Sequence, residues 1–199
     1  MRVLIENVAW ETYEALVEQR RGSVPRMHYV DGVLELMSPK RQHESLGRLI
    51  GRMIETYSEV KEIEIQSVAS TTFKRKELSK GFEADESYYV THAEQIRPKK
   101  EVDLRIDPPP DLVVEVEITS SAIEKLSLFA AMRVPEVWRY DGHQLEMFRN
   151  RDGAYQPVLE SVELPGLTAE TIMGYLKRRF DVGESALIRA FRRSMAVDQ

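Results

Sequence analysis

The sequence contains no cysteine, and this absence removes several kinds of site. Without thiols the chain has no disulfides, no zinc–thiolate centre and no cysteine nucleophile. Long apolar runs are missing too, because no stretch approaches the roughly 20 apolar residues that a membrane helix needs. Glu6 also interrupts the first residues too early for the apolar region of a signal peptide. We therefore expect a protein without a membrane segment, in a reducing compartment such as the cytoplasm.

Excess positive charge is the next missing feature. The 28 Lys and Arg residues are outnumbered by 33 Asp and Glu residues, so the formal net charge is −5 with neutral histidine. Proteins that coat nucleic acid without sequence preference rely on excess positive charge, and the composition argues against that class. Short basic runs do occur, for example at 74–76 and 177–179, so a local basic groove remains compatible with the sequence.

Several catalytic signatures are absent as well. The chain has no P-loop, no G-x-G-x-x-G and no G-x-S-x-G motif, which argues against nucleotide-binding folds and serine hydrolases. Its histidines are never spaced as in the zinc motif H-E-x-x-H. We therefore expect surface or turn positions, rather than metal-binding roles, for His28, His43, His92 and His143.

Apolar periodicity and turn residues predict an α/β or α+β fold with one mixed sheet, in a single domain over residues 1–199. Helices are predicted near 10–17, at 43–60, at 121–133 behind a capping box formed by Ser121 and Glu124, and twice after Thr168. Strands are predicted at 62–73, 87–90, 111–118 and 154–160, with hairpins around Asp31-Gly32 and Asp141-Gly142.

Two patterns on the predicted helices indicate packing surfaces, but they do not identify what packs against them. Gly47 and Gly51 lie on one helix and allow a neighbouring backbone to approach closely, which favours packing within the chain over dimerisation. The last helix carries an apolar stripe that covers either the chain's own core or a second subunit of a homodimer, formed by Leu187, Ile188, Phe191 and Met195.

The strand at 111–118 carries the first chemical signal. Side chains alternate along a strand, so Glu115 and Glu117 share one face with Cα atoms about 7 Å apart. Two neighbouring carboxylates repel and, where partly buried, need a cation or basic partners. A divalent ion such as Mg²⁺ is the natural partner for hard oxygen ligands. The alternative is a strand with one wet face, on which acids are harmless.

Lys125 and Asp85 add to this signal. Lys125 lies in the first turn of an otherwise apolar helix, where the helix dipole disfavours a cation. A residue that breaks a local rule without compensation is a candidate for function. Asp85 directly precedes the strand at 87–90, and if that strand neighbours the one at 111–118, Asp85 can meet Glu115 across the sheet.

With these residues in place, the sequence resembles the PD-(D/E)XK nuclease superfamily and, more closely, the Uma-type putative restriction endonuclease family. The matching stretches cover most of residues 29–142, in family order: YVDGVLELMSP, HESLGRLIGRMI, GFEADESYYV, PPPDLVVEVEITSS and KLSLFAAMRVPEVWRYDG. The resemblance implies a restriction-endonuclease-like core, with a central mixed sheet flanked by helices. The N-terminal hairpin and the strands and helices of 143–199 are additions to that core.

The resemblance also implies roles for individual residues. Asp85 and Glu115 would hold the metal, Mg²⁺ with Mn²⁺ as a substitute, and the carbonyl of Val116 would be a third ligand. Lys125 would neutralise the scissile phosphate or orient the attacking water. Glu44 would hold a water on the metal, as an acid does at this place in parts of the superfamily.

Two positions depart from the family signature. Ala84 stands where the signature has proline, which makes no ligand, and Glu117 stands where it has lysine. Either Lys125 has taken over the lysine's role, with Glu117 an additional ligand, or the site is weakened. The predicted function is a metal-dependent endonuclease that hydrolyses phosphodiester bonds in DNA. The alternative is an inactive nuclease fold that serves as a nucleic-acid-binding or interaction module.

Overall fold

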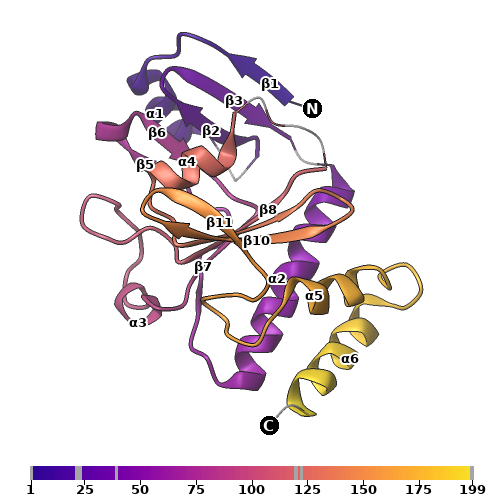
Figure 1. Ribbon diagram of the computed structural model, residues 1–199. Helices are drawn as coiled ribbons and strands as arrows, with labels where there is room; N and C mark the ends of the chain where they lie inside the picture. Colours follow the sequence, from indigo (N-terminus) through magenta and orange to yellow (C-terminus); the bar gives the residue numbers. More distant parts are fainter. Residues whose placement is uncertain (1, 21–23, 39, 119–120, 122, 198–199) are drawn as a thin grey trace.

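The computed structural model describes residues 2–20, 24–38, 40–118, 121 and 123–197, and in them the chain forms two sheets and six α-helices (Figure 1). The helices are α1 (Trp10–Gln19), α2 (Arg41–Lys61), α3 (Ala93–Ile96), α4 (Lys125–Ala131), α5 (Ala169–Leu176) and α6 (Glu184–Val197). The strands are β1 (Arg2–Ile5), β2 (Arg26–Val30), β3 (Val33–Met37), β4 (Gln66–Ser67), β5 (Phe73–Arg75), β6 (Lys80–Phe82), β7 (Glu86–Tyr89), β8 (Leu112–Val116), β9 (Glu136–Tyr140), β10 (Leu145–Arg151) and β11 (Ala154–Val158). A 3-10 turn at Lys76–Leu78 joins β5 to β6.

The central sheet has six strands in the order β11-β10-β9-β8-β7-β4. It is mixed, because β8 and β9 are parallel while the other pairs are antiparallel. Parallel neighbours need a crossover connection, and α4 provides it between β8 and β9. The predicted central mixed sheet is therefore confirmed.

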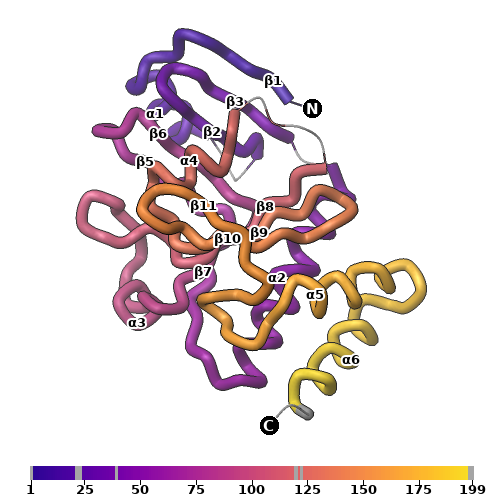
Figure 2. The backbone as a smooth tube through the Cα atoms, viewed as in Figure 1, coloured from indigo at the N-terminus to yellow at the C-terminus, as the bar shows by residue number. Residues whose placement is uncertain are grey.

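The N-terminal hairpin belongs to a second sheet that the sequence did not predict. Asp31 and Gly32, with φ of 49° and 90°, make the tight turn between β2 and β3. Strands from either side of α2 join this hairpin in the antiparallel order β1-β3-β2-β6-β5. The chain path in Figure 2 shows this sheet above the central one, and His28 of β2 lies 3.7 Å from Glu115 near the end of β8.

Helices cover the central sheet on both faces. Leu112, Val114 and Val116 of β8 pack with α2, α5 and α6, while Val113 packs on the other face with residues of α4. The apolar stripe of α6 is buried in the first of these cores, through Leu187, Ile188, Phe191 and Met195. That stripe therefore covers the chain's own core.

Gly47 and Gly51 do bring α2 close to β7. A Cβ atom at Gly51 would lie 2.7 Å from the hydroxyl of Tyr88 and 3.2 Å from the carboxyl group of Glu86. At Gly47 it would lie 3.4 Å from Cβ of Asp85. The two glycines thus set the distance between α2 and the strand that leads away from Asp85.

Two local predictions are wrong. The strand expected at 62–73 is broken by positive φ angles at Glu62 and Ala69, so that only the two residues of β4 pair with the central sheet. The capping box does not form because α4 begins only at Lys125, and Ser121 donates to Glu35, 3.0 Å away. Glu124 caps α4 by accepting from the backbone N–H groups of Leu126 and Ser127. Over the described ranges, no helix combines the length and apolar character needed to span a bilayer.

Candidate active site

The neighbouring ends of β7 and β8 bring Asp85 and Glu115 together. Glu86 at the start of β7 pairs with Val114 near the end of β8, so the two strands are neighbours, which is the condition under which Asp85 can meet Glu115. The Oδ2 atom of Asp85 accepts a hydrogen bond of 2.7 Å from the backbone N–H of Val116. The Asp85 carboxylate therefore lies beside the peptide group that follows Glu115.

Glu115 is paired with Lys125 inside the protein. The Nζ atom of Lys125 lies 2.6 Å from Oε2 of Glu115, and only 5% and 3% of the two side chains are exposed. Burial is the largest influence and would raise the pKa of Glu115, but the charge of Lys125 and the contact with His28 together outweigh it and hold that pKa well below its usual range. The cation that looked misplaced at the start of α4 is thus compensated by the acid at the end of β8.

Asp85 also meets a cation, Arg26 of β2. The guanidinium of Arg26 forms an ion pair with Asp85 and donates to Oε1 of Glu44 at 2.9 Å. The ring of His43 adds a further contact, with Nδ1 3.4 Å from Oδ1 of Asp85. Burial and the nearby charge of Arg26 lower the pKa of His43 to about 4, so this ring is neutral at neutral pH.

The histidine prediction is wrong for His28 and His43, which are both buried. The Nε2 atom of His28 lies 3.7 Å from Oε1 of Glu115, and burial together with the charge of Lys125 lowers the pKa of His28. The hairpin pattern gave no sign of this, because β2 is covered on both faces. The prediction is confirmed for His92, which lies in a turn, and for His143, which is exposed.

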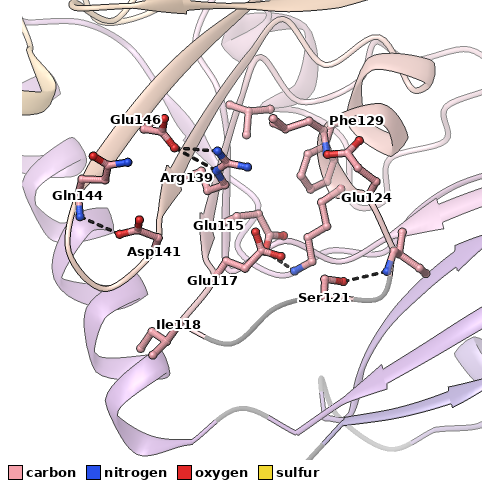
Figure 3. A pocket seen from close by; sticks show the side chains of 14 residues that line it. Glu115, Glu117, Ile118, Ser121, Glu124, Phe129, Arg139, Asp141, Gln144 and Glu146 are labelled. Atoms are coloured by element: carbon pink, nitrogen blue, oxygen red, sulfur yellow. Dashed lines mark hydrogen bonds and ion pairs between the residues drawn. The ribbon is translucent and has the colours of Figure 1, made fainter.

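Five of the predicted site residues line two separate cavities. Glu115, Glu117 and Lys125 line one of about 470 Å³, here called the Glu115 cavity. Figure 3 shows Glu115 and Glu117 side by side in it, with the pair Arg139 and Glu146 on another wall. Asp85 and Glu44 line a second cavity of about 400 Å³, the Asp85 cavity, together with six further residues: Arg26, Arg41, Ser45, Gly47, Arg48 and Glu86.

The predicted site residues therefore form two groups, which a single hydrogen bond connects. Asp85 and Glu44 are brought together by Arg26, and Glu115 is brought together with Lys125. The hydrogen bond from the Val116 N–H to Asp85 connects the two groups through the main chain. Arg26 contacts Asp85 and His28 contacts Glu115, and neither was among the predicted site residues.

The donor set suits a hard cation. Oδ1 of Asp85 lies in the ion pair with Arg26, and Oε1 of Glu115 is a buried oxygen that accepts no hydrogen bond. With the carbonyl of Val116 they would make the all-oxygen donor set that Mg²⁺ and Mn²⁺ prefer. Within the ranges that the structure describes, no three His, Asp or Glu side chains already form a metal-binding cluster, and Arg26 occupies one side of Asp85. A metal here would take over the charge that Arg26 now balances.

Known proteins share both sequence features and fold with this chain. The model of the Uma2 family, described as putative restriction endonuclease, matches residues 10–175. The chain belongs to the Uma2 family. The matched range includes all of the predicted site residues, Glu44, Asp85, Glu115, Val116, Glu117 and Lys125.

A solved structure shares the fold of this chain. A crystal structure described as a putative nuclease belonging to DUF820, from Anabaena variabilis ATCC 29413, aligns with a TM-score of 0.59 over 85% of this chain and 99% of that chain. The two sequences are 13% identical, so the similarity concerns the restriction-endonuclease-like fold alone. No curated protein matches the chain.

Proposed function

We propose that this Uma2 family member is a metal-dependent nuclease that hydrolyses phosphodiester bonds in DNA, with Mg²⁺ as its ion and Mn²⁺ as a substitute. The observation that carries the proposal is the hydrogen bond from the Val116 N–H, directly after Glu115, to Asp85, together with the ion pair between Lys125 and Glu115. Membership of a family described as putative restriction endonuclease supports the same reaction class.

The proposed role of each residue is the one that the family resemblance implies. A bound divalent ion would polarise the phosphate and lower the pKa of water. Asp85, Glu115 and the Val116 carbonyl would hold that ion. Glu44 is exposed, lines the Asp85 cavity and would hold a water on the metal. Lys125 would balance the charge that develops on the phosphate.

The ion pair at the end of β8 supports the hypothesis that Lys125 takes over the role of the signature lysine. Glu117 occupies the position of the signature lysine, yet the Nζ atom of Lys125 reaches Glu115 from α4 at 2.6 Å. A cation is thus available at the carboxylate although its side chain starts from a different element. Glu117 lines the same cavity and is an additional candidate ligand.

One observation favours a second function, that of a binding module without catalysis. Arg26 and Lys125 already neutralise the two carboxylates, and a buried ion pair with good geometry can persist without any metal. A protein of this kind would keep the fold and bind nucleic acid but leave its phosphodiester bonds intact.

A nuclease assay with the full chain separates the two functions. Plasmid DNA, linear duplex, single-stranded DNA and RNA are incubated with Mg²⁺ or Mn²⁺, and we expect cleavage of DNA that EDTA abolishes. Asp85→Asn and Glu115→Gln should each lose cleavage while circular dichroism shows a folded protein. Glu146→Gln is the matched control, because Glu146 lines the Glu115 cavity but pairs with Arg139. Cleavage that survives in Glu115→Gln, or no cleavage of any substrate, would contradict the proposal.

A further inference from the structure

The turn between α5 and α6 presents an aromatic ring to solvent. Phe180 is 79% exposed, although burying such an apolar side chain stabilises a fold. The guanidinium of Arg179 lies 4.4 Å from the centre of its ring. Nη1 of Arg179 also donates to the carbonyl of Leu176 at 2.8 Å, which fixes the cation over the ring. Phe180 is therefore an exposed aromatic surface held beside a positive charge.

More positive charge surrounds this ring. Lys177 and Arg178 precede it and are exposed, and Arg41 at the start of α2 lies across a cavity of about 520 Å³ that Phe180 and Arg179 line. The acid on this cavity, Glu184, forms an ion pair with Arg52. The surface made by Arg41 and residues 177–180, here called the Phe180 surface, is thus basic in a chain whose net charge is −5.

The Phe180 surface adjoins the candidate active site. Arg41 and Ser45 line both its cavity and the Asp85 cavity, so the two hollows share a wall formed by the first turns of α2. A chain of phosphates that enters the Asp85 cavity can therefore continue along Arg41 toward Phe180.

We infer that the Phe180 surface binds a single-stranded segment of nucleic acid next to the cleavage site, with one unpaired base stacked on Phe180. Arginine and lysine side chains bind phosphates, and an aromatic ring offers a stacking surface to any base that is not already stacked. Bases inside a duplex have both faces covered, so an isolated ring on a turn favours an unpaired nucleotide. The inference rests on the proposed function, because it names the substrate that the same site would take.

Binding can be tested without cleavage. A fluorescently labelled single-stranded DNA and its duplex are titrated with the full chain in EDTA, and fluorescence anisotropy gives the dissociation constants. Phe180→Ala should weaken binding of the single strand by about fivefold or more, the scale lost with one stacked base. Phe180→Trp should restore it. Ile106→Ala is the matched control, because Ile106 is 77% exposed but lines neither of the adjoining cavities.

The charges give a second readout. In the variant with both Lys177→Gln and Arg178→Gln, the slope of log affinity against log salt should fall by about 0.7 for each cation that contacts a phosphate. Equal binding by wild type and Phe180→Ala would overturn the inference, as would a preference for the duplex. A sedimentation coefficient that falls in Phe180→Ala would also overturn it, because a second copy would then cover the ring.

The outcome for this surface is distinguishable from that of the proposed function. If the chain cleaves DNA but Phe180→Ala leaves the dissociation constant unchanged, the nuclease stands and the inference fails. If Phe180→Ala loses binding of the single strand while no condition gives cleavage, the binding surface stands and the catalytic proposal fails.

Discussion

Among single residues, Lys125 and Arg26 decide how the carboxylates behave. Each is a buried cation paired with one acid of the site, Lys125 with Glu115 and Arg26 with Asp85. Removing one partner of a buried pair leaves an uncompensated charge, which costs about 3–5 kcal/mol of stability. Substitutions of the acids and of their partners should therefore change stability as well as activity, and the two effects need separate measurements.

Lys125→Ala should lower the turnover of nucleic acid by at least about a hundredfold, the scale of one lost contact to the transition state. Its melting temperature should fall because Glu115 stays behind without a partner, while the affinity for Mn²⁺ should not decrease. Lys125→Arg keeps the ion pair, so it should retain stability but regain only part of the turnover. Turnover is measured below the melting temperature of every variant. Normal turnover in Lys125→Ala would remove this lysine from the mechanism.

Arg26→Met should strengthen the binding of Mn²⁺ by about tenfold or more, because Arg26 is a competing cation at Asp85. Isothermal titration of the full chain measures this affinity. Arg48→Met is the control, since Arg48 lines the same cavity but pairs with Glu55 and Glu86, and it should shift the affinity much less. A weaker affinity in Arg26→Met would mean that the arginine holds Asp85 ready for the ion.

At the scale of elements, the approach of α2 to β7 makes a clear test. Gly51→Ala should destabilise the fold although alanine is the better helix former, because its Cβ would lie 2.7 Å from the hydroxyl of Tyr88. Gly174→Ala in α5 meets nothing within 4 Å and should stabilise by up to about 1 kcal/mol. Urea denaturation of both variants gives the comparison, and equal stabilisation by the two substitutions would refute the tight packing.

Most elements were predictable because their signals are local. Each of these signals lies within a short stretch of sequence. The Asp31-Gly32 turn corresponds to the hairpin of β2 and β3, and the apolar stripe of 43–60 corresponds to α2. The prediction at 62–73 failed because alternation describes side chains and not backbone pairing, and positive φ angles at Glu62 and Ala69 prevent a continuous strand. β1 was not predicted. It forms as a strand by pairing with β3.

The candidate site was predictable only in part, for a related reason. Asp85 directly precedes β7, Glu115 lies in its neighbour β8, and Lys125 begins α4, the helix that follows β8, so the order of elements brings them near one another. Arg26 and His28 come from the other sheet, and their contacts depend on how the two sheets pack. No spacing between positions 26 and 85 encodes that packing.

For the whole molecule, metal binding should appear as a gain in stability. An ion at a hundred times its dissociation constant stabilises the folded state by about 2.7 kcal/mol. For a chain of this length, that corresponds to a rise of roughly 5–10 °C in melting temperature. Differential scanning calorimetry with and without Mg²⁺ should show this rise in wild type and not in Asp85→Asn. An equal rise in both proteins would assign the ion to another place.

The position of β2 has a consequence for how this protein can vary between species. Because β2 carries Arg26 and His28 to the carboxylates of β7 and β8, a change of charge on one sheet leaves a buried charge unmatched on the other. Such changes survive only with a reciprocal change. In related sequences, positions 26 and 85, and likewise 28, 115 and 125, should therefore be replaced together, so that two stretches far apart in the chain share one evolutionary history.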